Sequence, residues 1–423
     1  MRYSIGIDKR CEEFIIPDEL SVDVMHAKEV SASGDEREIL SNSIAHPIGS
    51  PRLEELVDGD MTICIMTSDV TRPVPTARIL PTLMEYLHSC GVKDEKVTLA
   101  IALGSHRPQT EDELKYIMGE YYGKLRILNG NTREIVHVGT TKAGTPVDIF
   151  AEVIDADVRI GIGNVEYHYF AGYSGGAKAL MPGMSTFEAI QANHSLMVDP
   201  AAHAGNMQSP VRLDLEEGCA MVGLEFIVNV VLDEDKHIVY CASGHYIEAQ
   251  RDACRHLDEL YGCPISHQYD IVVASQGGAP KDLNLYQTQK ALDNAKNAVR
   301  DGGIIILVGS CKEGLGQPTF EEWLTESDSP QEVVDRLAAQ FKLGGHKAAA
   351  MAQVMLRADV YLVSDMPDEL VNSCFMRPFA SVQAAFDAAV EKLGHDSSVL
   401  VMPHAGSTLP LLQHGIHVPE PQQ

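Results

Sequence analysis

The chain has 423 residues, of which 45% are hydrophobic and 22% are charged, a composition ordinary for a globular protein of two or three domains. It has 33 Lys and Arg residues against 60 Asp and Glu residues, which gives a formal net charge of −27. Such an acidic chain repels phosphate groups, so we expect neither nucleic acid nor an anionic membrane as a partner. A small anionic substrate is still allowed, because a few cationic side chains can decide the charge of one pocket.

No apolar run reaches the roughly 18 residues of a membrane span, and the N-terminal residues lack the apolar core of a signal peptide. The nine cysteines are scattered singly, without a CxxC pair. This pattern favours reduced thiols over a disulfide framework. We therefore expect a cytoplasmic protein without a membrane partner.

Apolar, strand-like runs recur along the chain, and each ends at a polar or Gly-rich turn. They cover residues 61–69, 97–104, 156–164, 270–278, 303–311, 359–365 and 398–406. Amphipathic helical patterns lie between them, at 77–91, 289–303, 330–341 and 380–394. Continuous apolar strands that alternate with helices predict an α/β fold of two α/β domains with largely parallel sheets.

The stretch 253–270 closes a helix with Gly and Pro before a new strand begins. We place the domain boundary there, near His267, which predicts an N-terminal domain of residues 1–267 and a C-terminal α/β domain of residues 268–423. In open parallel sheets, ligands bind beyond the carboxyl ends of the strands. The polar turns that follow the strands are therefore the candidate site.

The most unusual segment is GNVEYHYFAGYSGGAKALMPG, residues 163–183. Its Gly-rich run at Ser174, Gly175 and Gly176 allows a ligand to approach the backbone closely, and the amides there can bind an anion. Lys178 precedes apolar residues, an environment that lowers the pKa of a lysine and makes its amine nucleophilic. SGGAK lacks the full phosphate-loop spacing, so a flexible loop with a surface lysine is also compatible with it.

Three of the 17 histidines are distinguished by context. His106 follows a strand in ALGSHRP, His168 lies in the Gly-rich segment, and His194 ends an amphipathic stretch that begins at Ser185. A neutral imidazole can transfer protons or bind nickel or zinc. Taken singly, each is also compatible with a structural histidine in a turn, a helix cap or the core.

Two further segments carry groups that can bind anions. SDVTRP supplies Asp69 and Arg72, where Arg suits forked recognition of a carboxylate, although a surface salt bridge is the common alternative. LNLYQTQKAL supplies Tyr286, Gln287 and Lys290, and the last two share one face of a helix. This segment is either an ordinary exposed helix start or a substrate-binding element of the second domain. The second interpretation predicts an active site in the interdomain cleft.

Taken together, these segments resemble the nickel-dependent lactate racemase family over nearly the whole chain. The resemblance rests on SDVTRP (68–73), ALGSHRP (102–108), YQTQKAL (286–292), the weaker AHPIGSPRL (45–53) and above all residues 166–197. In this last segment the spacing His-x9-Lys-x15-His matches the family pattern without gaps.

The resemblance implies an isomerase, a racemase or epimerase that inverts C2 of a 2-hydroxy acid by hydride transfer to a nickel-pincer nucleotide. This cofactor is a pyridinium-3-thioamide-5-thiocarboxylic acid mononucleotide, which accessory enzymes must build. The implied roles are a covalent tether for Lys178, a nickel ligand for His194 and an acid–base pair for His106 and His168. The remaining implied contacts go to cofactor or substrate and involve Asp69, Arg72, Ser174, Gly175, Gly176, Tyr286, Gln287 and Lys290.

One segment departs from the family pattern. Where we expect lactate-specific members to have a tryptophan in the second domain, this chain has GGHKAAAMAQVM (344–355), and its only tryptophan is Trp323. The departure allows a substrate larger than lactate, such as a malate-like, aryl or sugar acid. His346 or Lys347 is then either a specificity residue or a surface residue.

Two alternative functions remain open from the sequence. One is a zinc-dependent hydrolase or lyase in which His106, His168 and His194 are three metal ligands beside an open position. The other is a non-catalytic binding protein that retains the fold.

Overall fold

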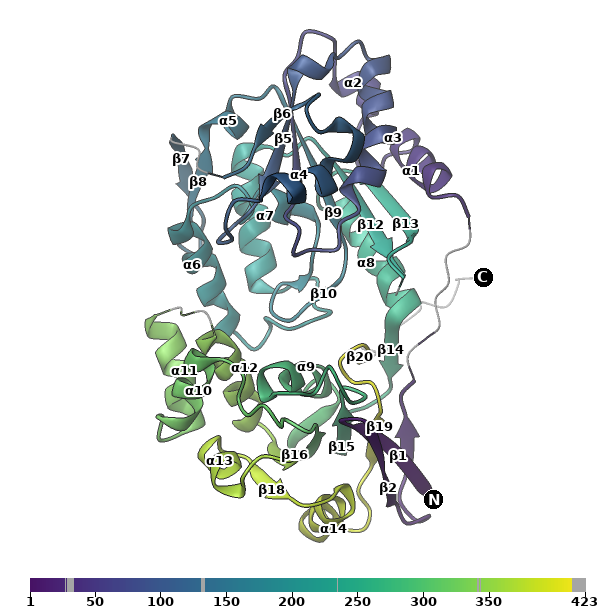
Figure 1. The fold of residues 1–423 in the computed structure, drawn as a ribbon, viewed down its shortest axis with the longest axis vertical. Helices are drawn as coiled ribbons and strands as arrows, with labels where there is room; N and C mark the ends of the chain where they lie inside the picture. The colour runs from purple at the N-terminus through teal and green to yellow at the C-terminus, as the bar shows by residue number, and fades with distance from the viewer. Residues whose placement is uncertain are drawn as a thin grey trace, which may run out of the picture. The chain divides into compact units, whose positions relative to one another are not determined.

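The computed structural model describes residues 1–412 except 27, 29–33, 131–133, 234, 341 and 343. It divides into two compact units: a middle unit, Glu29–Leu260, and a terminal unit made of Met1–Lys28 together with Tyr261–Gln423. Each unit is built on a six-stranded, largely parallel sheet, which confirms the predicted α/β class (Figure 1). No helix among the described residues is long and apolar enough to cross a membrane.

The middle sheet has the strand order β13-β12-β9-β4-β5-β6, and only the pair β12–β13 is antiparallel. The strands are β4 (Ile63–Ser68), β5 (Val97–Ala102), β6 (Arg126–Leu128), β9 (Val158–Asn164), β12 (Phe226–Leu232) and β13 (Ile238–Gly244). Two hairpins accompany this sheet, β7 (Ile135–Thr140) with β8 (Pro146–Phe150) and β10 (Tyr167–His168) with β11 (Gly172–Tyr173). The helices are α1 (Glu36–Ala45), α2 (Leu53–Leu56), α3 (Thr76–Ser89), α4 (Glu111–Met118), α5 (Ala151–Ile154), α6 (Phe187–Ser195), α7 (Pro210–Val222) and α8 (Glu248–Tyr261).

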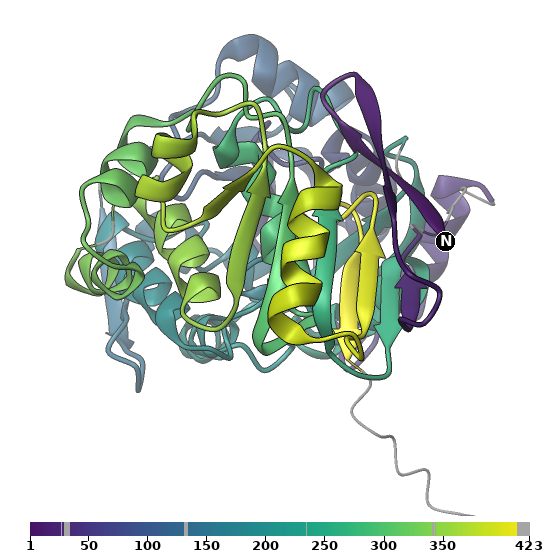
Figure 2. The same ribbon diagram turned by 90° about the horizontal axis from the view of Figure 1, so that it is seen from below.

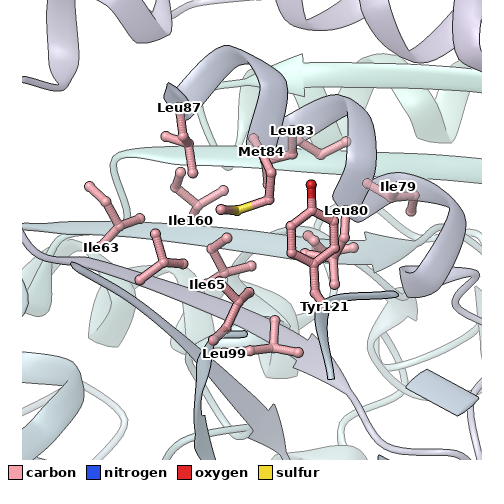
Figure 3. Packing of buried hydrophobic residues seen from close by; sticks show 14 of the residues in the cluster. Ile63, Ile65, Ile79, Leu80, Leu83, Met84, Leu87, Leu99, Tyr121 and Ile160 are labelled. Atoms are coloured by element: carbon pink, nitrogen blue, oxygen red, sulfur yellow. The ribbon is translucent and has the colours of Figure 1, made fainter. Parts of the chain in front are cut away.

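Helix α3 shows why the predicted alternation of strands and helices folds as it does. Its apolar side chains recur on one face and pack against β4, β5 and β9, as Figure 3 shows. Leu83, Met84 and Leu87 are fully buried, as are Ile65 and Leu99 opposite them. Burial of one such side chain stabilises the fold by about 1.5–3 kcal/mol. This packing holds α3 against these three strands.

The terminal sheet has the order β18-β17-β16-β15-β19-β3, and all its pairs are parallel. Its strands are β3 (Val22–Val24), β15 (Tyr269–Ser275), β16 (Val299–Val308), β17 (Asp359–Val363), β18 (Arg377–Phe379) and β19 (Val399–Met402). A second small sheet pairs β14 (Gly262–Ile265) with β20 (Leu409–Leu412). The helices are α9 (Leu285–Ala295), α10 (Pro318–Thr325), α11 (Pro330–Ala339), α12 (Gly345–Met355), α13 (Asp368–Ser373) and α14 (Val382–Leu393).

The N-terminal 28 residues join the terminal unit, although the sequence placed residues 1–267 in one domain. β1 (Arg2–Ile7) and β2 (Arg10–Ile15) form an antiparallel hairpin that packs Phe14 into the same core as α14. Figure 2 shows this hairpin beside the terminal sheet. Strand β3 then adds to the edge of the sheet, where Val22 pairs with Val399. At the other junction the units divide between Leu260 and Tyr261, seven residues before His267, and residues 413–423 lie outside the described part.

One predicted element is wrong at its end. The helix expected over 289–303 is α9, which stops at Ala295, and Val299 already pairs with Tyr269 as the start of β16. The Gly pair at 302–303 lies inside that strand, where Gly302 adopts a φ of +74° beside an irregularity in the pairing. The sequence predicts a helix stop at these Gly residues, whereas in the structure they accommodate a bulge.

Candidate active site

The carboxyl ends of β4, β5 and β9 meet at one edge of the middle sheet, and the residues that follow them line a single pocket of about 900 Å³, part of it open to solvent. This is the place where an open parallel sheet binds ligands. The pocket collects every site residue that the sequence predicted within the middle unit. These are Asp69, Arg72, His106, His168, Ser174, Gly175, Gly176, Lys178 and His194.

Asp69 and His106 form a hydrogen-bonded pair, with 2.5 Å between Asp69 Oδ2 and His106 Nδ1. Thr71 also donates to Asp69, from its backbone N–H (2.7 Å) and from its hydroxyl (2.5 Å). Burial alone would raise the pKa of Asp69, but the hydrogen bonds from His106 and Thr71 hold it below its ordinary value. An ionised carboxylate only accepts, so His106 carries its proton on Nδ1 and keeps the lone pair of Nε2 free.

The Gly-rich loop is held against Asn229 of β12. Gly175 and Gly176 have φ angles of +73° and +61°, and Gly176 N–H donates to Asn229 Oδ1 at 2.7 Å. A Cβ atom at Gly175 would collide with Asn229 Oδ1 and lie 3.0 Å from Val165 Cγ2. Glycine is therefore required at this position for both conformation and space.

Arg212 of α7 fixes the same loop from its buried side. Its side chain is 0% exposed and donates to the carbonyls of Ala171 (3.2 Å), Gly175 (3.3 Å) and Tyr173. Five donors in a rigid fork allow one Arg to satisfy several carbonyls. The sequence does not single out this residue, because VRLDLEEG has the pattern of an ordinary amphipathic helix.

Lys178 lies on a short 3-10 helix, Gly176–Ala179, and its amine lies 6.0 Å from the centre of the Phe170 ring. Burial, and then the positive charges of Arg212 and Arg72, hold the pKa of Lys178 well below its ordinary value. An uncharged amine is a nucleophile. The environment of Lys178 is therefore that of a reactive lysine and not of a surface lysine.

His168 is held differently from His106. Its Nδ1 accepts a hydrogen bond from the backbone N–H of Ala171 at 3.3 Å, which places the proton of the neutral ring on Nε2. Burial keeps the pKa of His168 well below its ordinary value, and a positive charge on the neighbouring Lys178 or His194 would lower it further. In this form Nε2 of His168 is a hydrogen-bond donor, whereas Nε2 of His106 is an acceptor.

The Phe170 ring contacts both His168 and His194, with ring centres 4.5 and 4.8 Å apart. Within the described residues no group of three His, Cys, Asp or Glu side chains can hold a metal ion. The zinc site expected of His106, His168 and His194 in the alternative function is therefore not formed. A bulky aromatic ring packs against two of the three imidazoles, and the Nδ1 of the third is engaged by Asp69.

Asn229 and Asn164 also line the pocket and were missed from the sequence. Asn164 is 5% exposed, and its Nδ2 has no hydrogen-bond partner among the residues that the structure describes. Buried donors are rarely left unpaired, so a ligand acceptor is expected there. A lone Asn inside the apolar strand FIVNVVL was the available signal for Asn229.

The remaining predicted residues, Tyr286, Gln287 and Lys290, lie on α9 of the terminal unit. Tyr286 and Gln287 are half-buried, and Lys290 is exposed. The Lys347 amine lies 3.9 Å from the centre of the Tyr286 ring and donates to the Tyr286 carbonyl at 3.0 Å. Burial, and then Lys290, lower the pKa of Lys347 to about 8, so Lys347 is not an ordinary surface residue.

Comparisons with known proteins place the chain in a family. Residues 7–205 match the family model of the lactate racemase N-terminal domain, and residues 265–409 match that of the lactate racemase C-terminal domain. The chain belongs to the lactate racemase family. Two curated lactate racemases are similar to it, one from Thermoanaerobacterium thermosaccharolyticum (31% identity, 94% of this chain and 96% of the relative) and one from Lactiplantibacillus plantarum (33%, 87% and 89%).

Comparison with solved structures shows that the fold is similar as well. The lactate racemase apoprotein from T. thermosaccharolyticum superposes with a TM-score of 0.81 at 30% identity, over 97% of this chain and 100% of that one. A protein from Thermotoga maritima shares the fold alone, with a TM-score of 0.57 at 19% identity over 89% and 97% of the two chains. As a member of this family the chain is an isomerase of the racemase class that acts on a small molecule.

Proposed function

We propose that this protein inverts C2 of a 2-hydroxy acid with a nickel-pincer nucleotide that is tethered to Lys178 and whose nickel is bound by His194. The observation that carries the proposal is one pocket that combines a lysine amine whose pKa is lowered by burial, the imidazole of His194 and the Asp69–His106 pair. We further propose that the enzyme works in the cytoplasm, beside the accessory enzymes that build the cofactor.

The residues present fit this cofactor. Lowering the pKa of Lys178 favours its nucleophilic, neutral amine, which suits formation of a thioamide bond. A nickel ion bound by His194 needs further ligands, which the two sulfur arms and the ring carbon of the pincer would provide. The unpartnered Nδ2 of Asn164 and the glycine backbone at 175–176 leave room and donors for polar groups of the nucleotide.

When bound, the cofactor supplies a reversible acceptor for the hydride of C2, and the protein supplies the proton chemistry. His106 Nε2 takes the proton of the substrate hydroxyl, and the Asp69 carboxylate stabilises the imidazolium that results. His168 donates a hydrogen bond from Nε2 to the substrate oxygen. Arg72 lines the same pocket and pairs with the substrate carboxylate.

The relatives are named for lactate, and we propose lactate or a larger 2-hydroxy acid as the substrate. Tyr286, Gln287 and Lys290 are proposed to bind it, with Lys347 as a specificity residue. Alanine at Gln287 or Lys290 should raise KM for the preferred acid. A panel of 2-hydroxy acids that differ in size and charge, assayed with Lys347→Met, tests the last assignment.

The experiment uses protein produced in a host that makes the cofactor. Intact mass should show an adduct on Lys178, metal analysis should show nickel, and a chiral assay should show interconversion of hydroxy-acid enantiomers. Lys178→Ala should lose all three, whereas Lys142→Ala, which changes an exposed lysine of the same unit, should lose none. An unmodified Lys178 without nickel in catalytically active protein would overturn the proposal.

A further inference from the structure

His194 lies at the C-terminal end of α6, and the residue before it, Asn193, is completely buried (0% exposed). The Asn193 side chain makes three hydrogen bonds. Its Nδ2 is 3.0 Å from the carbonyl of Val211 and 2.9 Å from Asp214 Oδ2, and its Oδ1 is 3.0 Å from His194 Nδ1. Asn193 therefore connects the pocket histidine to a carboxylate in the core.

These partners decide the orientation of the amide. A backbone carbonyl and an ionised carboxylate can only accept, so the group that faces both of them must be the NH2 of Asn193. The oxygen is then left to face His194, and an oxygen only accepts. His194 must therefore carry its proton on Nδ1, and the lone pair of the neutral ring is on Nε2. The choice of tautomer follows from the network and not from the histidine itself.

Asp214 anchors this network deep in the middle unit. The carboxylate is 4% exposed and makes no ion pair with any described residue. Instead it accepts from the hydroxyls of Thr141 (2.5 Å) and Thr145 (2.7 Å) in addition to Asn193. Charge-assisted hydrogen bonds of this kind compensate part of the cost of burying a carboxylate. Its negative charge polarises the Asn193 amide and strengthens the bond to His194.

A purely structural role accounts for only part of this arrangement. Thr141 and Thr145 belong to the turn between β7 and β8, so their hydrogen bonds to Asp214 of α7 would hold that hairpin in place without Asn193. The hydrogen bond between Asn193 and His194 does not contribute to holding the hairpin. Metal-binding histidines usually have this kind of support, in which the nitrogen that does not bind the metal donates to a fixed acceptor.

We propose that Asn193 and Asp214 are positioning residues that hold His194 in its Nδ1–H form, so that Nε2 is the atom offered to a metal in the pocket. The proposal rests on the proposed function, in which His194 binds nickel. It assigns a role to a buried carboxylate that takes no part in the acid–base chemistry.

The first test uses the cofactor-free full chain labelled with 15N-histidine. Nitrogen NMR in mildly alkaline buffer should show His194 with a protonated Nδ1 and an unprotonated Nε2, its signal being identified by its loss in His194→Gln. Asn193→Ala should remove this preference. A wild-type His194 with its proton on Nε2 overturns the proposal whether or not the enzyme binds nickel.

The second test uses the loaded holoenzyme and a chelator competition that measures nickel affinity. Asn193→Ala and Asp214→Asn should keep the Lys178 adduct but bind nickel about 10–100-fold more weakly, the usual effect of losing such support. Ser195→Ala is the matched control and should retain wild-type affinity, since among the described residues its hydroxyl bonds only to the Ala192 carbonyl on the same helix. If either variant fails to fold, Thr145→Val, which removes a single hydrogen bond to Asp214, replaces it and should show a smaller loss.

The outcomes separate the two proposals. Wild-type protein without adduct or nickel contradicts the proposed function. Loaded wild-type protein whose variants hold nickel as tightly as Ser195→Ala contradicts only the role of Asn193 and Asp214.

Discussion

Asp69 is almost completely buried (3% exposed), whereas its partner His106, 2.5 Å away, keeps 40% of its side chain exposed toward the pocket. The pair thus joins a fixed carboxylate to an accessible imidazole. The carboxylate fixes both the tautomer and the direction of the ring, and in the proposed function it would stabilise the charge that appears when His106 takes a proton.

Asp69→Asn should therefore lower kcat by about 10²–10³-fold, which is within the usual contribution of general acid–base catalysis. KM, nickel content and the Lys178 adduct should stay near wild type, because the amide keeps the shape of the carboxylate. Initial rates in both directions measure the effect. Asp148→Asn is the control, since Asp148 makes the same contact with His137 (2.6 Å) at a site outside the pocket. Equal activity of the two variants would contradict the role of Asp69.

The sequence could predict that Asp69, His106 and His168 meet, because each follows an apolar run that is typical of a parallel strand. The carboxyl ends of parallel strands lie at one edge, so the turns converge whatever the rest of the fold. The same logic cannot find Arg212 or Asp214. Their roles depend on how α7 packs against a loop and a hairpin, and nothing in the local pattern of a helix records that.

The sequence could not predict the placement of the first 28 residues, for a similar reason. Strand β3 has three residues, too few to show a period, and it pairs with β19 near the other end of the chain. Its partner can be known only from the finished sheet. The misplaced end of the 289–303 helix is a different failure, since a glycine pair can stop a helix or form a bulge with equal ease.

Arg212→Lys should destabilise the cofactor-free protein by about 2–4 kcal/mol, because an ammonium group cannot replace the guanidinium fork and leaves buried carbonyls unpaired. Urea unfolding measures this change. Arg255→Lys should stay within about 0.5 kcal/mol of wild type, since Arg255 forms an exposed ion pair with Asp252. The Lys178 adduct should also form in lower yield in Arg212→Lys, because the loop that carries Lys178 loses its support. Equal stability of the two variants would show that the loop does not depend on Arg212.

Gly175→Ala and Gly123→Ala form a matched pair for the Gly-rich loop. Both positions have a positive φ, +73° and +80°, so each substitution costs about 1–3 kcal/mol in backbone strain. A Cβ at Gly123 meets nothing within 4 Å, whereas one at Gly175 collides with Asn229. Gly175→Ala should therefore be the less stable variant by at least about 1 kcal/mol and should load less cofactor. Equal melting temperatures and equal loading would mean that the loop moves freely away from Asn229.

His346 should make the stability of the terminal unit depend on pH. The side chain is 7% exposed, and burial lowers its pKa from 6.5 to about 4. Between these two values the unfolded chain binds a proton that the folded unit does not, so stability falls as the pH is lowered from about 6.5 to 4. The loss should reach roughly 3 kcal/mol at the lower end, since each pKa unit corresponds to about 1.4 kcal/mol.

The only tryptophan, Trp323, is buried on α10 of the same unit and packs next to Gly345, so its fluorescence reports this unit selectively. Urea titrations followed at Trp323 should show the midpoint falling over this pH range. In the wild type, the Gly344 N–H donates to His346 Nδ1 (3.1 Å). A glutamine at position 346 keeps an acceptor for this N–H but cannot be protonated, so His346→Gln should flatten the dependence of the midpoint on pH. His137→Gln, which changes an exposed histidine of the middle unit, should leave it unchanged. If His346→Gln kept the wild-type slope, the proton would have to be taken up at another group of the terminal unit.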